Sequence, residues 1–232
     1  MDQLVFFWVG EDISVPEFFV KSIKKTDSKI KIIQVSDLKT KKIKEVNSFV
    51  RYDLPKEIML ARLKAYSLIE TKYQNTIFCD ADTLMIKDFS FVEYKTGYHI
   101  MPRKLDSLIN HLWPEHYPEF KDKFFADIMP FLFGAIIISK DDNFFNNLFN
   151  ICKKLPSRFH RWYGDQVSLH IYYLDNKKKF SLFHQEKNMH IIDPNEKCEY
   201  QFINKLRAKG VSFITFKGHE SKKRIKDFYN YV

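Results

Sequence analysis

The amino-acid sequence predicts an α/β protein in which helices flank one mostly parallel, Rossmann-like sheet. The first observation behind this prediction is that strand and helix patterns alternate along residues 1–90. The second is that residues 91–232 continue with further strands and amphipathic helices. The third is composition, because 232 residues that are 45% hydrophobic and 16% aromatic can bury one substantial core. We therefore expect a single domain over residues 1–232.

Short apolar runs and amphipathic segments follow one another in the first half of the chain. The strand patterns cover residues 4–10, 29–37 and 76–86, and the helical patterns cover residues 14–26 and 58–69. Ser14 is the expected N-cap of the first helix, because Pro16 and Glu17 then lie in its first turn and lysines lie near its end. Strands separated by helices favour a largely parallel sheet.

The second half of the chain is less regular. Its strand patterns cover residues 97–104, 131–141, 190–193 and 211–218, and its helical patterns cover residues 141–155 and 163–174. No internal repeat divides it, so we expect it to extend the same fold.

The net charge of the chain indicates which class of partner it binds. The net charge of +9 and the pI near 9.2 favour an anionic one: a nucleic acid, a nucleotide, an acidic glycan or a membrane surface. Three widely spaced cysteines without a C-x-x-C pair favour a reduced, cytoplasmic chain. The apolar N-terminal run is short and bounded by acids, so it indicates a strand and not a signal peptide. The many lysines also allow peripheral docking on anionic lipid.

Two aspartates, Asp80 and Asp82, stand directly after the apolar residues 76–79. The chain has 17 aspartates, so about one such D-x-D pair is expected by chance and the spacing alone proves nothing. Position is more informative, because a strand would deliver both at its carboxyl end, where open α/β sheets bind ligands. Residues two apart in an extended segment also point the same way.

Converging carboxylates repel each other unless a cation lies between them. Their hard oxygens suit Mg²⁺ or Mn²⁺, which would take further ligands from substrate phosphates. The alternative is that Asp80 and Asp82 merely form the next turn, since aspartate is a common turn former. Both interpretations stay open on the residues alone.

Residues 62–89 resemble the core of the GT-A glycosyltransferases, in particular the family 8 and family 32 enzymes that use nucleotide-sugar donors. In those families a helix with an arginine precedes a strand that ends in D-x-D and a hydrophobic residue. Here Arg62, then Asp80 and Asp82, then Leu84 match that pattern in order.

Three further stretches resemble the family in the expected order. The strand around Gly134 resembles the one beside the donor sugar, and Asp165 with Gln166 resembles the start of the G-D-Q helix. Residues 213–224 resemble the closing H-F-x-G-x-x-K segment through Gly218 and the lysines after it. The resemblance thus covers nearly the whole chain, with residues 1–100 as the nucleotide-binding half and residues 101–232 as the acceptor side.

The resemblance implies a metal-dependent hexosyltransferase that takes a nucleoside-diphosphate sugar, with a UDP-sugar favoured. The acceptor would be a saccharide or a lipid-linked saccharide, and the likeness to family 8 implies retention of the anomeric configuration. Asp165 and Gln166 would act at the transferred sugar and Asp80 and Asp82 would hold Mn²⁺ or Mg²⁺. The residues expected to contact the donor are Trp8, Val9, Gly10, Arg62, Asp80, Ala81, Gly134, Gly218, Lys222 and Lys223.

The closing segment departs from the family pattern. Thr215 stands where the family has a metal-binding histidine, and the nearest histidine, His219, follows Gly218. Either His219 supplies the third metal ligand, or the aspartates and phosphates hold the ion without it. Lys222 and Lys223 are interchangeable as the phosphate-binding lysine on sequence alone.

Aromatic residues punctuated by proline could form the acceptor side. Trp113, Tyr117, Trp162 and Tyr163 either stack on sugar rings or pack in the core, and packing is favoured for most aromatics in this chain.

Two other protein classes compete with this interpretation. A haloacid-dehalogenase-like phosphatase also has D-x-D after an apolar strand, but in its first strand and with Thr or Val where this chain has Leu84. A basic nucleic-acid-binding protein would fit the charge, yet the basic residues are scattered among acids and no recognised nucleic-acid motif is present. We expect no stable nucleic-acid complex.

Overall fold

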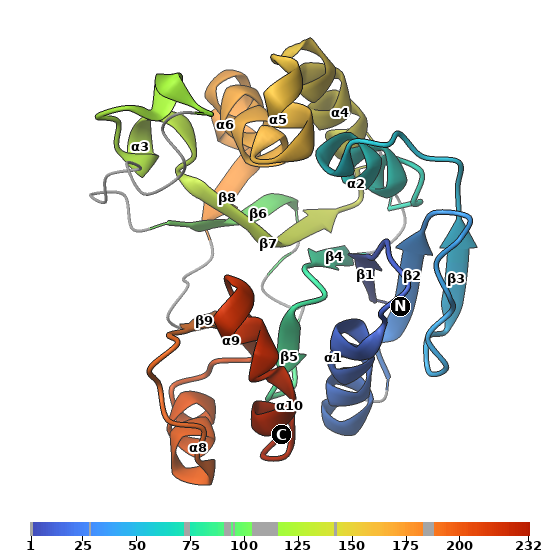
Figure 1. The fold of residues 1–232 in the computed structure, drawn as a ribbon, viewed down its shortest axis with the longest axis vertical. Coiled ribbons are helices and arrows are strands. Elements are labelled where there is room, and N and C mark those ends of the chain that lie inside the picture. The colour runs from blue at the N-terminus through green and yellow to red at the C-terminus, as the bar shows by residue number, and fades with distance from the viewer. Residues whose placement is uncertain are drawn as a thin grey trace.

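A computed structural model describes residues 2–27, 29–71, 75–90, 94, 96–103, 116–141, 143–182 and 188–232. Its larger sheet has the strand order β3-β2-β1-β4-β7-β6-β8 (Figure 1). The strands are β1 (Gln3–Phe7), β2 (Lys31–Ser36), β3 (Ser48–Arg51), β4 (Asn75–Cys79), β6 (Gly97–Pro102), β7 (Phe131–Ser139) and β8 (Phe180–Leu182). Strands β3, β2, β1 and β4 run parallel, and β6 is parallel to β8. Only β7 among them runs against its neighbours, β4 and β6. The mostly parallel α/β fold predicted from the sequence is confirmed.

Helices cover both faces of this sheet because successive side chains of each strand point to opposite sides. The flanking helices are α1 (Ser14–Thr26), α2 (Ile58–Ser67), α4 (Phe144–Lys154), α5 (Ser157–Arg161) and α6 (Gly164–Asn176). In β1, Leu4 and Phe6 pack in the apolar cluster of α1, whereas Val5 and Phe7 pack in that of α2, α4 and α6. Figure 1 shows α1 on one side of the sheet and α2, α4, α5 and α6 on the other.

A second, smaller sheet lies beside the larger one and holds the C-terminal segment. Its strands are β5 (Thr83–Met85), β10 (Phe213–Phe216) and β9 (Met189–Ile192), in the order β5-β10-β9. The helices α8 (Tyr200–Ala208), α9 (His219–Lys223) and α10 (Ile225–Tyr229) accompany it. Because β10 pairs antiparallel with β5, the end of β10 lies beside the start of β5. Short turns of helix complete the described elements: η1 (Pro118–Phe120), α3 (Phe125–Ile128) and η2 (Lys177–Lys179).

Two predicted element boundaries need correction. The strand predicted over residues 76–86 is two strands in different sheets, since β4 ends at Cys79 and β5 begins at Thr83. The aspartates lie in the break between them. Ser14 is the first residue of α1 and not its cap, because Ile13 holds the cap position. The Ser14 N–H donates to Asp12 Oδ1 at 2.9 Å.

None of the helices in the described part of the chain has both the length and the apolar character needed to span a bilayer.

Candidate functional site

The Asp80–Asp82 segment connects the two sheets. It follows the carboxyl end of β4, where the Asp80 N–H donates to the Gly134 carbonyl of β7 at 2.9 Å. The Asp82 carbonyl accepts the Phe216 N–H of β10 at 2.9 Å. These backbone bonds fix the carboxylates where the larger sheet meets the smaller one. The side chains are 20% and 10% exposed, so both carboxylates are largely withdrawn from water.

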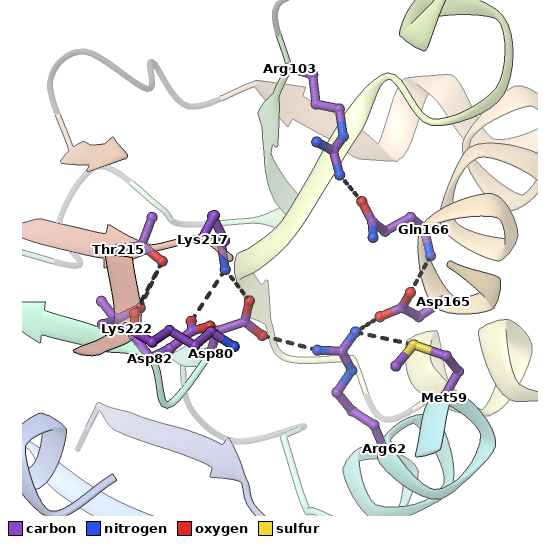
Figure 2. A network of polar contacts seen from close by, with 11 residues as sticks. Met59, Arg62, Asp80, Asp82, Arg103, Asp165, Gln166, Thr215, Lys217 and Lys222 are labelled. Carbon is purple, nitrogen blue, oxygen red and sulfur yellow. Dashed lines mark hydrogen bonds and ion pairs between the residues drawn. The ribbon is translucent and has the colours of Figure 1, made fainter. Parts of the chain in front are cut away.

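Arg62 of α2 joins Asp80 to Asp165 at the start of α6 (Figure 2). Its Nη1 lies 3.0 Å from Asp80 Oδ1, and its Nη2 pairs with Asp165 Oδ2. The guanidinium carbon lies 4.7 Å from the centre of the Phe133 ring, so an aromatic face covers the charge. Asp165 is fully buried and also accepts the Gln166 N–H at 2.8 Å. Arg62 therefore positions two carboxylates from different elements.

Lys217 and Lys222 approach the aspartates from the smaller sheet. Lys217 follows β10, and its Nζ lies 2.6 Å from Asp80 Oδ2 and 3.3 Å from Asp82 Oδ1. Lys222 of α9 places its Nζ 2.8 Å from Asp82 Oδ2. Each of the four carboxylate oxygens of the pair is thus engaged by a cationic side chain. With Asp165, three acids and three bases form what we call the charge cluster: Arg62, Asp80, Asp82, Asp165, Lys217 and Lys222.

Ionisation in the charge cluster follows from these contacts. Burial raises the pKa of Asp80, but the nearby charges of Lys217 and Arg62 lower it more, so it lies below its ordinary value. Burial lowers the pKa of Lys217, but the carboxylates of Asp80 and Asp82 raise it more, so it lies above its ordinary value. Asp80 and Lys217 are therefore both charged at neutral pH.

Glycine leaves room for the charge cluster at Gly134 of β7. A Cβ there would lie 3.5 Å from Asp80 Oδ2 and 3.5 Å from Lys217 Nζ, so even a methyl group would touch both charged atoms. Gly218 follows Lys217 with φ of +80°, a conformation that glycine adopts without strain. The space beside its Cα is open, since no atom lies within 4 Å of a Cβ built there.

Gln166, the second residue predicted to act at the sugar, lies next to Asp165 on α6. Its Oε1 accepts a hydrogen bond from Arg103 Nη2, and the Arg103 guanidinium carbon lies 4.7 Å from the centre of the Phe125 ring. Burial lowers the pKa of Arg103 to about 10. Arg103 was not among the predicted site residues, and its pairing with Gln166 brings β6 and α6 together at one end of the cluster (Figure 2).

Trp8, Val9 and Gly10 follow the carboxyl end of β1, the strand next to β4 and parallel to it. The Trp8 N–H bonds the Val35 carbonyl at 3.1 Å, and its Nε1 bonds the Asp12 carbonyl at 2.9 Å. Val9 is 36% exposed, and Gly10 has φ of +140°. These residues share a sheet edge with the charge cluster. Ala81 is buried between the two aspartates.

No hydrogen bond or ion pair joins His219 or Lys223 to the aspartates in the described part of the chain. His219 is an exposed first residue of α9, and Lys223 pairs with the exposed Glu220 at 2.7 Å. Lys222, and not Lys223, contacts the aspartate pair, which the sequence could not decide. No group of three or more His, Cys, Asp or Glu residues in the described ranges is arranged to hold a metal ion.

The residues of the charge cluster can be compared with the ligands that a resident Mn²⁺ or Mg²⁺ would need. Carboxylate oxygens suit such an ion. Here, however, the ammonium of Lys217 lies between the two carboxylates, and a protonated amine has no lone pair with which to bind a metal. An ion could enter only if Lys217 left Asp80 and Asp82. The arrangement of these residues does not fit a resident divalent ion.

Sequence reasoning missed Lys217 although it lies inside the stretch that resembles the family. Residues two apart on a strand face the same side, so Lys217 extends the side of Thr215 past the end of β10. Its position directly before Gly218, after an apolar strand, was the available signal.

The aromatic residues considered for the acceptor side mostly pack in the core. Tyr117 and Tyr163 are buried and their ring centres are 5.1 Å apart, whereas Trp162 is 46% exposed. Trp113 lies outside the described residues. Trp162 is thus the one of the three described rings that is open to solvent.

Comparisons with known proteins find likeness in structure. No protein-family model and no curated protein matches the sequence. The fold is similar to that of the glycosyltransferase GlyE of Streptococcus pneumoniae TIGR4, with a TM-score of 0.53 and 14% identity over 81% of this chain. It is also similar to the galactosyltransferase LgtC, solved with donor and acceptor sugar analogs, with a TM-score of 0.56 and 13% identity over all of this chain. The match covers 96% of the LgtC chain but 47% of the GlyE chain, so this chain spans about half of GlyE. The predicted GT-A type of fold is confirmed.

Proposed function

We propose that this protein is a glycosyltransferase that moves a hexose from a nucleoside-diphosphate sugar, with a UDP-sugar favoured, to a hydroxyl group of a saccharide or lipid-linked saccharide. The observation that supports this most strongly is the charge cluster, which gathers two lysines and an arginine around an aspartate pair at the carboxyl edge of a GT-A type sheet. Open α/β sheets bind ligands at that edge.

The reaction explains why cations belong at this place. The bond between the anomeric carbon and the donor's phosphate oxygen breaks, and the acceptor oxygen forms a new bond to that carbon. The nucleoside diphosphate leaves with added negative charge, and stabilising such charge is commonly the largest catalytic contribution. Lys217 and Lys222 would donate hydrogen bonds to the departing phosphates.

Donor and acceptor would meet across the cluster. Trp8, Val9 and Gly10, on the same sheet edge, would contact the base and ribose, with Ala81, Gly134 and Gly218 beside the diphosphate. Gln166 and Asp165 would lie at the transferred sugar. Both carboxylate oxygens of Asp165 have partners in Arg62 and the Gln166 N–H, so its role is to position these groups and not to attack the sugar. Transfer with retention, in which the acceptor proton passes to the departing phosphate, needs no enzyme nucleophile.

The family resemblance alone implies dependence on Mn²⁺ or Mg²⁺ with His219 as a third ligand. This dependence requires Lys217 to leave the aspartates and the exposed His219 to turn toward them.

A phosphatase of the haloacid-dehalogenase type is less compatible with the geometry. Its nucleophilic aspartate must present a free oxygen to phosphorus, whereas both oxygens of Asp80 are engaged by Arg62 and Lys217.

A panel of UDP- and GDP-hexoses tests the proposed function. Binding would be measured by ligand-observed NMR and slow donor hydrolysis by release of UDP or GDP, each with Mn²⁺ and with EDTA. Asp82→Asn should lower donor hydrolysis at least about tenfold, because it removes charge that anchors both lysines. Asp88→Asn, an exposed aspartate outside the cluster, is the matched control and should behave like wild type. The proposal fails if the folded protein binds no donor under either condition.

A further inference from the structure

We propose that Lys217 and Lys222 together take the place of a divalent metal ion in this protein and hold the donor diphosphate through their ammonium groups. The inference rests on the proposed function, because it concerns how the donor of that reaction is bound. It makes the enzyme independent of added metal, contrary to what the D-x-D resemblance implies.

The position of Lys217 is the first support. Its Nζ lies between the two carboxylates, at 2.6 Å from Asp80 and 3.3 Å from Asp82, where an ion shared by the pair would have to lie. Lys222 binds the remaining oxygen of Asp82 at 2.8 Å. Two ammonium groups supply the same two positive charges as one Mg²⁺ or Mn²⁺. The aspartate pair is therefore neutralised by side chains of this chain.

The ammonium groups keep hydrogen-bonding capacity for a ligand. Each has three N–H donors. Lys217 directs two toward the aspartates and Lys222 directs one, which leaves three donors for phosphate oxygens. The side chains are 34% and 42% exposed, so the unused donors can reach solvent and a bound diphosphate. Charge-assisted hydrogen bonds of this kind are among the stronger ones in proteins.

The end of β10 presents an amine and not a metal ligand. Thr215, on the same side of the strand as Lys217, is fully buried. Its hydroxyl lies 3.3 Å from the Thr83 hydroxyl and 3.4 Å from the Asp82 carbonyl, so it is directed into the sheet. The His219 side chain is exposed and lies outside the cluster. Among the described residues, the side chains that pair with the two carboxylates are thus the cations Arg62, Lys217 and Lys222, and none of them is an acid or a histidine.

The lack of a side chain at Gly134 leaves the space that the Lys217 side chain occupies. A Cβ at this position would lie 3.8 Å from Lys217 Cε and 3.5 Å from Lys217 Nζ. A Cβ would therefore just contact the lysine stem, and a side chain larger than that of alanine would compete with the stem for this space. The space beside Gly134 accommodates the lysine in its place between the aspartates.

The test is nucleotide binding with and without metal. Binding of UDP and GDP to the protein, stripped of metal beforehand, would be measured by calorimetry in excess EDTA and in Mn²⁺. Free Mn²⁺ would be followed separately by electron paramagnetic resonance. We expect nucleotide affinity in EDTA to equal that in Mn²⁺ within about threefold, and the protein alone to bind no Mn²⁺ at the aspartate pair.

Variants of Lys217 distinguish a site that holds the diphosphate by lysines from a site that holds it by a metal ion. Lys217→Met should lose at least about tenfold in UDP affinity in EDTA and should gain Mn²⁺ binding, because it leaves the two carboxylates without a shared cation. Lys217→Arg keeps the charge and should bind UDP in EDTA without binding Mn²⁺. Lys226→Met, an exposed lysine of α10, is the matched control and should behave like wild type. Circular dichroism melts would establish that each variant is folded.

The outcomes distinguish this inference from the proposed function. If UDP or GDP binds only with Mn²⁺, and wild type itself takes up Mn²⁺ with Lys217→Met no better, the inference is overturned and the proposed function stands. If neither nucleotide binds the folded wild type in either buffer, both are overturned.

Discussion

Replacing Arg62 by methionine tests whether the charge cluster is an interdependent unit. The Arg62 side chain is 16% exposed, and its guanidinium joins Asp80 to Asp165, whose side chain is 0% exposed. Removing one partner of a buried ion pair typically costs about 3–5 kcal/mol, because the other charge is left without compensation. Asp80 keeps Lys217 as a partner, so the lower end of that range applies. We expect Arg62→Met to lower the free energy of unfolding by about 3 kcal/mol.

Denaturation in guanidinium chloride would measure this loss. The double variant Arg62→Met with Asp165→Asn should recover about 2 kcal/mol, because it removes the uncompensated charge. Arg51→Met is the matched control: Arg51 is exposed on β3 and donates to the Leu38 carbonyl at 3.2 Å, so the change should stay within about 0.5 kcal/mol. A loss below about 1 kcal/mol for Arg62→Met, or a double variant no more stable than the single one, would refute the reasoning.

Three further predictions follow from the same contacts. Gly134→Val should weaken UDP binding at least about tenfold, and Gly134→Ala should weaken it less. The added methyl groups would press on Asp80 Oδ2 and Lys217 Nζ, each 3.5 Å from the Cβ position. Equal UDP affinities of both variants and the wild type by calorimetry would contradict this. Gly164→Ala should destabilise the protein by about 1–3 kcal/mol in thermal melts, since its Cβ would lie 2.3 Å from the Phe159 carbonyl oxygen; an unchanged melting temperature would show that this turn relaxes freely. The pKa of Asp80 is lower in the folded than in the unfolded protein, so its contribution to stability is present above the unfolded pKa near 3.8 and is lost as the pH falls below that value. Asp80→Asn should therefore reduce the loss of unfolding free energy between neutral and acidic pH. An unchanged loss would argue against the pairing.

Much of the fold was predictable because the pattern of apolar residues is local. The alternation that predicts strands at residues 4–10 and 29–37 and a helix at residues 14–26 depends only on neighbours in sequence, and the strands and helix occur there. The same reasoning placed Asp80 and Asp82 after a strand. It missed β3 and α8, whose apolar residues are few or half-buried.

What the sequence could not show depends on contacts between distant segments. The apolar residues on either side of the aspartates look like one strand, and only the pairing of β5 with β10 separates them into two sheets. Lys217 meets Asp80 across that pairing, from 137 positions away in the chain. The choice between Lys222 and Lys223 likewise depends on which side of the short helix α9 faces Asp82. Local periodicity carries no information on any of these contacts.

A crystal structure of the protein with bound UDP tests the central claim most directly. The proposed function predicts the diphosphate within hydrogen-bonding distance of the Nζ atoms of Lys217 and Lys222, beside Gly134, with the ribose toward Trp8 and Gly10. UDP bound at another surface, with the charge cluster unchanged and out of contact with the phosphates, would contradict it.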